Sequence, residues 1–325
     1  MSTLALVDKV DIQVLVDNAT DSLSSIPAHA ESEFAYLERH GMRELSGDSL
    51  CCACHGLSLL ITATRGNSKH CVLFDSGPEE YAFERNSGRL GLHLELVDSV
   101  VLSHGHWDHA GGMLKALELI RARDAARSIP YYAHPGMFRS RARRLPNGDF
   151  MPMKNVPSVE ALTAHGAYVN CTREPRLLLD GMFYLSGEIP RVTPFERGLP
   201  AHYQKSEDES WQPDPLLMDE RFLMVNVARK GLVVFTACSH AGVVNVLKHA
   251  RDCADGAPIH AVMGGFHLAG ANEEIIPETV QALSEFNLST IAAGHCTGWR
   301  AVVALAGAFG NSVVEPSVVG KRYTF

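Results

Sequence analysis

Long apolar runs are absent from this 325-residue sequence. None of its apolar stretches is long enough to span a bilayer, so we expect no contact with membranes. Asp8, Lys9 and Asp11 interrupt the apolar residues near the start, where a signal peptide needs a continuous apolar core. Internal repeats, low-complexity tracts and Gly/Ser linkers are missing as well. We therefore expect a cytoplasmic protein that forms a single domain over residues 1–325.

Cysteine pairs and clustered basic residues are also scarce. The eight cysteines do not suggest a disulfide framework in a chain of this length. Cys51, Cys52 and Cys54 have no second CxxC-type partner for a zinc knuckle, and we interpret them as buried thiols near a strand entry. The formal net charge is -8 and the basic residues are mostly scattered, which disfavours long nucleic acid as a partner. We expect a small-molecule substrate and leave a homo-oligomer open.

One arginine cluster departs from this even distribution of charge. Such a run is typical of a solvated helix face, and contact with an anionic substrate or a neighbouring subunit is the alternative. Its members are Arg139, Arg141, Arg143 and Arg144.

Apolar patterns predict a sheet in each half of the chain. In the first half, helical spacing predicts one helix over residues 113–123, and short apolar runs predict strands over residues 12–16, 57–63, 71–74, 97–102 and 131–133. The second half begins with a hairpin and then alternates, with strands over residues 222–228, 232–237, 259–263 and 289–293 and helices over residues 243–251 and 277–286. Two sheets with helices outside, an αββα sandwich, is the predicted α/β architecture.

The stretch between Pro190 and Pro215 shows no clear period. It is rich in proline, charged and aromatic residues. A segment of this length without regular structure inside a compact domain is usually a lid or a substrate loop. We therefore predict such a loop at about residues 190–215.

The strongest chemical signal is the stretch S-H-G-H-W-D-H-A-G-G at residues 103–112, between a predicted buried strand and a predicted helix. Its imidazoles and carboxylate belong to His104, His106, Asp108 and His109. Four such side chains within six residues, on a turn that contains glycine, converge when the loop folds around a divalent cation. We expect His104 and His106 to face one metal ion, and Asp108 and His109 to face another.

Each later predicted core strand leads into a histidine. The first leads into Cys238-Ser239-His240, the next into His267 and the last into His295. Loops at the carboxyl ends of strands share one edge in α/β sheets, and ligands bind at that edge. We therefore expect these histidines to meet the first cluster, although each of them alone is also compatible with an ordinary core or surface position.

Three further polar residues are candidates for the surroundings of this site. Asp75 ends a predicted strand, and we expect its carboxylate to bind backbone donors of the histidine loop and hold the ligands in place. His134 and Glu188 are expected to line the pocket and to contact the substrate.

The motif H-x-H-x-D-H-A-G-G after a strand, preceded by F-D-S-G, resembles the metallo-β-lactamase superfamily over most of the chain. More narrowly, H-G-L-S-L-L-I, T-A-C-S-H-A-G, G-G-F-H-L and G-H-C-T-G at residues 55–61, 236–242, 264–268 and 294–298 resemble one subgroup of metal-dependent hydrolases. That subgroup includes the archaeal dihydropterin-ribofuranosylaminobenzene-phosphate synthases. The resemblance implies a metallo-β-lactamase fold with a binuclear metal site. Its implied ligands are His104, His106, Asp108, His109 and His295, with a metal-bridging residue at Cys238.

Two departures from the family pattern affect this site. Cys238 stands where hydrolases of the superfamily usually have aspartate, and a thiolate favours zinc over magnesium or calcium, with manganese or iron as alternatives. The region between Phe183 and Phe222 lacks the third histidine motif of the family. His240 is the preferred substitute because it lies two residues beyond Cys238, on the same side if the strand continues. Glu188 and His202 are less favoured substitutes.

This combination of ligands predicts hydrolytic chemistry. Two divalent ions held close together lower the pKa of a bridging water and act as a Lewis acid toward a substrate oxygen. Asp108 is expected to orient the nucleophile, and His240 or His267 to protonate the leaving group. We predict a metal-dependent hydrolase that cleaves a small ester-type substrate, such as a phosphoester, a lactone or a thioester.

Three alternatives remain open. The resemblance allows a transferase that acts on a phosphorylated pterin-like or ribosyl substrate. An iron-containing redox protein is a second alternative, although the diiron flavoproteins of the superfamily have glutamate where this chain has His106. A metal-dependent binding protein without enzymatic activity is the third, because the third histidine motif is missing.

Overall fold

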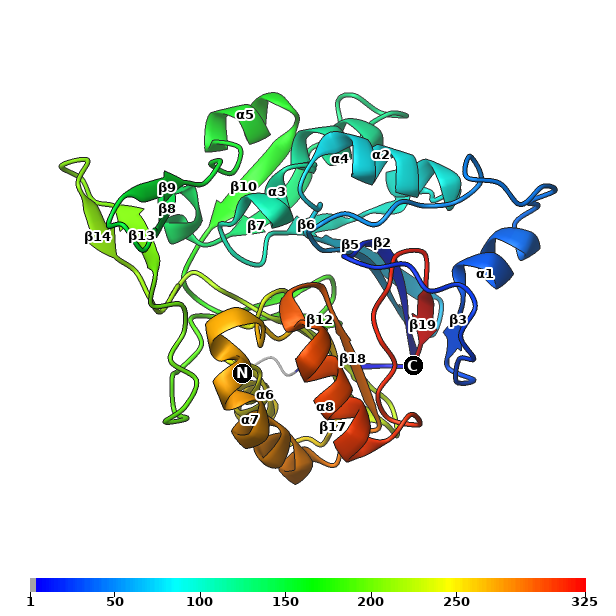
Figure 1. Cartoon of the computed structure of the whole chain (residues 1–325). Coiled ribbons are helices and arrows are strands. Elements are labelled where there is room, and N and C mark those ends of the chain that lie inside the picture. The colour runs from blue at the N-terminus through cyan, green and yellow to red at the C-terminus, as the bar shows by residue number, and fades with distance from the viewer. Residues whose placement is uncertain (1–3) are drawn as a thin grey trace.

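The computed structural model describes residues 4–325, and Figure 1 shows its helices and strands. Its α-helices in chain order are α1 (Glu33–Arg39), α2 (Glu80–Arg89), α3 (Trp107–Ala110), α4 (Met113–Ile120), α5 (Val159–Ala164), α6 (Val243–Cys253), α7 (Ile276–Leu283) and α8 (Trp299–Phe309). Short 3₁₀ helices lie between them, namely η1 (Leu94–Leu96), η2 (Pro135–Phe138), η3 (Gly270–Ile275), η4 (Ser284–Phe286) and η5 (His295–Thr297).

The strands form three sheets. The amino-terminal sheet has the order β10 (Ala167–Cys171), β7 (Ile129–Ala133), β6 (Ser99–Val101), β5 (Ser68–Phe74), β4 (Ser58–Arg65), β2 (Lys9–Val16), β19 (Arg322–Thr324) and β3 (Ala30–Glu31). The carboxy-terminal sheet has the order β11 (Arg176–Leu178), β12 (Phe183–Leu185), β15 (Leu223–Val227), β16 (Gly231–Phe235), β17 (Ile259–Gly265) and β18 (Thr290–Gly294), with β1 (Leu6–Val7) beside β15. The side sheet has the order β14 (Trp211–Pro213), β13 (His202–Lys205), β8 (Arg141–Arg144) and β9 (Phe150–Pro152).

The two large sheets pack face to face and enclose the main core. This core contains Ile61 and Phe74 from the amino-terminal sheet and Phe235 and Met263 from the carboxy-terminal sheet, all of them fully buried. Helices α2, α4 and α5 cover the outer side of the first sheet, and α6, α7 and α8 cover the outer side of the second (Figure 1). These four layers confirm the predicted αββα sandwich.

Parallel strand pairs bring the site-bearing loops to one edge. Strands β5, β6 and β7 are parallel neighbours, and so are β16, β17 and β18. All five residues of β16 are buried, as expected for an apolar strand covered on both faces. Phe235 pairs with Met263, and Phe74 pairs with Val101, so neighbouring strands end at similar levels. The loops that follow these strands therefore lie together.

The side sheet corrects two expectations. The arginine cluster forms strand β8 instead of a helix face, and Arg141 is buried whereas Arg143 and Arg144 are exposed. The segment at residues 190–215 contains strands β13 and β14, so it is not irregular throughout. Strand β8 pairs with β13 from a distant part of the chain, which no local pattern reveals, and the local hairpin of β13 and β14 carries no strong apolar alternation.

Across residues 4–325, none of the helices combines the length and the apolar composition that crossing a membrane requires.

Candidate metal centre

The histidine loop follows β6 and turns through the short helix α3. Its glycines stand where the backbone is in close contact with neighbouring segments. A Cβ on Gly105 would lie 2.5 Å from the carbonyl oxygen of Met137, and one on Gly111 would lie 1.8 Å from that of Pro78. Larger residues do not fit at either position, so the loop packs tightly against η2 and the segment before α2.

Three imidazoles form the first of two candidate ligand sets, which are named the first and the second ligand set. Nε2 of His104 lies 3.0 Å from Nδ1 of His106 and 3.2 Å from Nε2 of His240, and all three side chains are buried. A tetrahedral zinc ion with Zn–N bonds of about 2.0–2.1 Å keeps its ligand atoms roughly 3.3 Å apart. The nitrogens are thus already spaced as ligands of one such ion.

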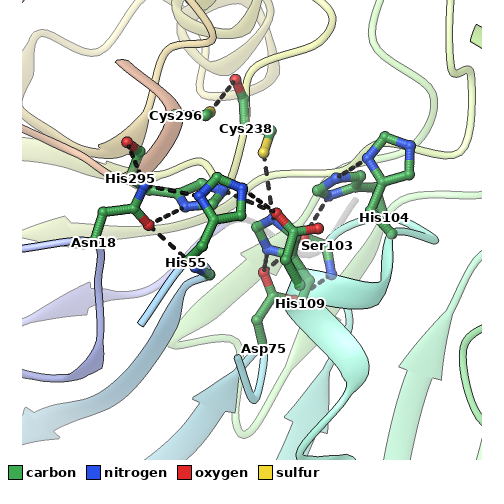
Figure 2. Close-up of polar contacts among 12 residues, drawn as sticks. Asn18, His55, Asp75, Ser103, His104, His109, Cys238, His295 and Cys296 are labelled. Carbon is green, nitrogen blue, oxygen red and sulfur yellow. Dashed lines mark hydrogen bonds and ion pairs between the residues drawn. The ribbon is translucent and has the colours of Figure 1, made fainter. Parts of the chain in front are cut away.

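A carboxylate, two imidazoles and a thiol form the second ligand set. Oδ2 of Asp108 lies 3.5 Å from Nε2 of His295 and 3.7 Å from Nε2 of His109. Sγ of Cys238 lies 3.3 Å from Nε2 of His109 (Figure 2). Nε2 of His295 is buried and has no hydrogen-bond partner among residues 4–325. A buried lone pair beside a carboxylate and a thiol fits a divalent transition metal.

The turn after β16 carries two of the grouped side chains, those of Cys238 and His240. The strand ends at Phe235, and Ser239 has a left-handed backbone with φ 54°. We expected His240 to reach the site because the strand would continue past Cys238. The strand ends earlier, so this expectation is wrong. His240 instead reaches the first set because the chain bends, while Cys238 remains beside the second.

The other substitutes for the third histidine lie outside the ligand sets. Nε2 of His202 lies 3.0 Å from Nε2 of His106, which is the ring nitrogen of His106 that does not face His104. Glu188 accepts a hydrogen bond in a separate pocket, where its Oε1 lies 3.1 Å from Nε2 of His134. The structure therefore groups neither residue with His104 and His240.

Asp75 anchors the histidine loop. Its Oδ1 accepts a hydrogen bond from the backbone N–H of Ser103 at 2.8 Å, and its Oδ2 accepts from the Ser103 hydroxyl at 2.7 Å. The same Oδ2 lies 2.8 Å from Nδ1 of His109, which places the Nδ1 proton of that ring on the carboxylate side. The expected structural role of Asp75 is confirmed, and Nε2 of His109 is directed toward Cys238.

Two more buried carboxylates hold ligand loops by their backbone. Asp219 accepts from the N–H of Gly105 at 2.9 Å and pairs with Nη2 of Arg141 at 2.7 Å. Glu220 accepts from the N–H groups of His240 and of the next residue, each at 2.7 Å. Burial raises the pKa of Glu220 to about 7, although these N–H groups lower it. Both carboxylates precede β15, so one short segment positions two loops.

Asp17 holds the loop of His295 in the same way. Its Oδ1 accepts from the backbone N–H of His295 at 2.8 Å, and its Oδ2 accepts from the Ser317 hydroxyl at 2.8 Å. Burial raises the pKa of Asp17 to about 7. His295 itself has a left-handed backbone with φ 47°, a strained conformation that these hydrogen bonds maintain.

Burial keeps most of the imidazoles neutral. It lowers the pKa of four histidines well below the usual range, and neighbouring imidazoles lower it further, in His104, His106, His240 and His295. His109 differs, because the carboxylates of Asp108 and Asp75 outweigh burial and raise its pKa to about 9. Neutral rings offer the lone pairs that metal coordination needs.

His267 and Cys296 lie at the border of the two sets. The ring of His267 is centred 4.5 Å from that of His240, and Sγ of Cys296 lies 3.6 Å from the carbonyl oxygen of Cys238. Burial acts to raise the pKa of Cys296, but hydrogen bonds with Cys238 and His267 lower it to about 5. His267 is half-buried and lines a small cavity of about 10 Å³ together with Arg197 and the other candidate acid, His240.

The two residues expected to contact substrate lie in a neighbouring cavity. His134 and Glu188 line a cavity of about 320 Å³, together with Arg139 and Arg173. Asp219 also borders this cavity and holds Gly105 on its other side. Asp219 thus connects the cavity to the histidine loop. His134 and Glu188 themselves are not among the grouped candidate ligands.

The sequence analysis did not identify Asn18 and His55 as site residues. Figure 2 shows Asn18 between His55 and His295, with hydrogen bonds to both rings. Asn18 follows a predicted strand, so the rule of polar residues at strand ends could have identified it. His55 precedes a strand and begins the H-G-L-S-L-L-I motif of the subgroup resemblance, but that motif was not linked to a role in the site.

The family comparison agrees with this geometry. The chain matches the family model described as the metallo-beta-lactamase superfamily over residues 53–210, and it belongs to that superfamily. Within it, 249 residues are 30% identical to the 7,8-dihydropterin-6-methyl-4-(beta-D-ribofuranosyl)-aminobenzene-5'-phosphate synthase of Methanocaldococcus jannaschii, over 76% of this chain and 82% of that protein. An uncharacterised protein of the same organism is 28% identical over 78% of this chain and 87% of its own length.

Solved structures share the same fold. The crystal structure of Tm1679, a metal-dependent hydrolase of the beta-lactamase superfamily, superimposes with a TM-score of 0.69 at 22% identity, over 96% of this chain and 98% of that one. The structure of unliganded yeast PDE1 superimposes with a TM-score of 0.54 at 9% identity, over 99% of this chain and 100% of that one. The superfamily and the named synthase relative support the status of an enzyme.

Proposed function

We propose that this protein is a metal-dependent hydrolase that cleaves a small ester-type substrate, such as a phosphoester, a lactone or a thioester. The observation that carries the proposal is the convergence of the first ligand set, with ring nitrogens 3.0–3.2 Å apart, beside a second set of different chemistry. The rings of His104 and His109 are centred 4.3 Å apart, so the two sets adjoin. Two adjoining sets of candidate ligands support the proposal that the site binds two divalent ions.

The donors divide between the two ions. His104, His106 and His240 would hold the first ion, and Asp108, His109 and His295 would hold the second. Cys238 remains the proposed ligand shared by both, because its Sγ groups with His104 and His109 and also with His240 and His267. Bound there, the ions supply a Lewis acid and lower the pKa of a water molecule. The thiol of Cys238 favours zinc, with manganese or iron as alternatives.

Residues of the chain itself would orient the reactants. Oδ2 of Asp108 lies 3.7 Å from Nε2 of His109 and 3.5 Å from Nε2 of His295, so at this site it can accept a hydrogen bond from the attacking nucleophile and orient it. His267 is half-buried beside His240 and is our first candidate to protonate the leaving group, with His240 as the other. His134 and Glu188 are proposed to contact a more distant part of the substrate from their cavity.

The synthase relative favours a second candidate function. A transferase would use the same ligand sets to activate a phosphorylated leaving group toward an acceptor other than water. The 30% identity to a synthase over most of both chains supports this alternative. Phosphorylated pterin-like or ribosyl compounds are its candidate substrates.

One experiment addresses both candidates. Elemental analysis of the purified protein is combined with a panel of phosphomonoester, phosphodiester, lactone and thioester substrates, run in ¹⁸O-labelled water. The hydrolase predicts two divalent ions per chain and a product that carries solvent oxygen. Turnover without ¹⁸O incorporation identifies the transferase, and a protein that binds no divalent ion contradicts both functions.

Four expectations about the wider molecule stay proposals. These are one domain over residues 1–325, a cytoplasmic location, self-association, and a lid at about residues 190–215. Two contacts support the lid: Arg197 lines the cavity beside His267, and His202 touches His106.

A further inference from the structure

The side-chain amide of Asn18 has one orientation. Its Oδ1 accepts from the backbone N–H of Gly56 at 3.1 Å, and its Nδ2 donates to the backbone carbonyl of His295 at 3.1 Å. A backbone N–H only donates and a backbone carbonyl only accepts, so the reverse orientation would set donor against donor and acceptor against acceptor. The positions of oxygen and nitrogen in this amide are therefore fixed by the main chain.

This orientation determines which nitrogen of His295 is protonated. Nδ1 of His295 lies 3.0 Å from Oδ1 of Asn18, which can only accept. Nδ1 therefore donates, and in the neutral ring the lone pair is on Nε2. Nε2 is the buried atom that faces Asp108 at 3.5 Å in the second ligand set. Asn18 thus prepares His295 to act as a ligand.

The same amide has the opposite effect on His55. Nδ1 of His55 lies 3.0 Å from Nδ2 of Asn18, which can only donate. Nδ1 of His55 therefore accepts, and its proton is on Nε2. That Nε2–H lies 3.4 Å from Oδ2 of Asp108, and the side chain is 57% exposed. His55 consequently presents a hydrogen-bond donor at the solvent side of the second ligand set.

Neighbouring rings hold His55 in this place. Its ring is centred 5.1 Å from that of His295 and 6.0 Å from that of Trp107. Gly56, the next residue, cannot be larger, because a Cβ there would lie 2.4 Å from the carbonyl oxygen of Asp108. The backbone of His55 is therefore packed against the histidine loop while its ring stays open to solvent.

We propose that His55 contacts the substrate and donates its Nε2–H to a substrate oxygen at the second ligand set, and that Asn18 is the positioning residue that fixes opposite tautomers in His55 and His295. The part concerning His55 rests on the proposed function, since it requires an oxygen-bearing substrate at this site. The part concerning Asn18 follows from the hydrogen bonds alone.

The tautomers are tested by nuclear magnetic resonance of the zinc-loaded and metal-free protein with ¹⁵N-labelled histidine at pH 8. Long-range ¹H–¹⁵N correlations distinguish Nδ1–H from Nε2–H rings, and single substitutions assign the signals. We expect Nε2–H in His55 and Nδ1–H in His295. In Asn18→Asp both side-chain oxygens accept, so His55 should change to Nδ1–H while His295 stays unchanged. A wild-type His55 with its proton on Nδ1, or no change in Asn18→Asp, overturns the proposal.

Metal affinity separates the two effects of Asn18. Asn18→Leu removes the acceptor of His295 and should weaken zinc binding roughly 10- to 100-fold, as removal of an outer partner of a ligand does. Asn18→Asp keeps that acceptor and should bind zinc at least as tightly as the wild type. Equal zinc affinity in the wild type and in Asn18→Leu contradicts the positioning role.

The donor role of His55 is tested with inorganic phosphate, a tetrahedral oxyanion, by calorimetry on zinc-loaded protein. His55→Phe keeps a ring but no donor and should bind phosphate about tenfold more weakly, whereas His55→Gln supplies an amide donor and should restore binding. With any substrate that is turned over, His55→Phe should lower kcat/KM by about 10²-fold. Unchanged phosphate binding in His55→Phe overturns the donor role. Phosphate binding that depends on His55 without turnover of any panel substrate contradicts the proposed function alone.

Discussion

Nε2 of His202 lies 3.0 Å from Nε2 of His106, and Nδ1 of His202 lies 2.9 Å from the backbone carbonyl of Asp214. A carbonyl only accepts, so Nδ1 of His202 is the protonated nitrogen and its Nε2 accepts from Nε2–H of His106. The lone pair of His106 is then on Nδ1, the atom that faces His104. The side sheet, through β13, thereby sets the tautomer of a ligand in the first set.

Removing this acceptor should weaken metal binding without unfolding the protein. We expect His202→Leu to lower zinc affinity at the first set roughly 10- to 100-fold, because the tautomer and orientation of His106 are no longer fixed. His202→Gln offers an amide oxygen and should restore most of the affinity. Chelator competition measures both variants, and wild-type affinity in His202→Leu would show that the contact has no such role.

Replacing His106 itself should cause a larger loss of metal binding. We expect His106→Ala to lower the metal content and to abolish any turnover while the protein stays folded, because it removes one donor of the first set. His93→Ala is the matched control, since the side chain of His93 is 69% exposed and contacts Glu95 on the surface. Elemental analysis and thermal unfolding check this. Full metal content and full rate in His106→Ala would rule out the assignment of the site.

Zinc binding should release protons, and the pKa shifts identify their source. Burial raises the pKa of the Cys238 thiol well above its usual range, and the pKa of His109 is raised to about 9, so both are protonated in metal-free protein at pH 7.5. Ligands lose these protons on binding, so zinc affinity should rise with pH from 7 to about 9.

Histidines with lowered pKa values, such as His104 and His240, are already neutral and release none. Calorimetry in buffers of different ionisation enthalpy should show release of about two protons in the wild type and about one in Cys238→Ala. The same release in both proteins would exclude the thiol as a ligand.

The buried pair of Asp219 and Arg141 should contribute to stability as well as to the site. Both side chains are at least 96% buried, and they lie 2.7 Å apart. Asp219→Ala leaves the guanidinium buried and unpaired, which should lower the free energy of unfolding by about 3–5 kcal/mol. The double variant Arg141→Met, Asp219→Leu should recover most of this stability but should bind zinc more weakly, because Gly105 loses its acceptor. Urea denaturation and zinc titration test the two effects separately.

The sequence was sufficient for the layers and for most of the side chains that the structure gathers at the candidate metal centre. Strands such as β16 are apolar along their whole length, and the histidines after β16, β17 and β18 stand at strand ends whose parallel pairing brings them together. These features are local or follow from a general rule of parallel sheets, so they are visible in one sequence.

The remaining contacts depend on segments that meet only in the folded chain. In the sequence, Asn18 is 37 positions from His55 and 277 positions from His295, both of which it contacts. His202 is 96 positions from its contact His106. The bend that directs His240 to the first set depends on a left-handed residue, Ser239, which no propensity favours. Such contacts are set by tertiary packing, and a single sequence carries no pattern for them.

Anomalous diffraction from crystals grown with zinc tests the central claim most directly. The account predicts two anomalous peaks, one bounded by His104, His106 and His240 and the other by Asp108, His109, Cys238 and His295. Crystals that bind zinc elsewhere, with no peak between these side chains, would contradict it.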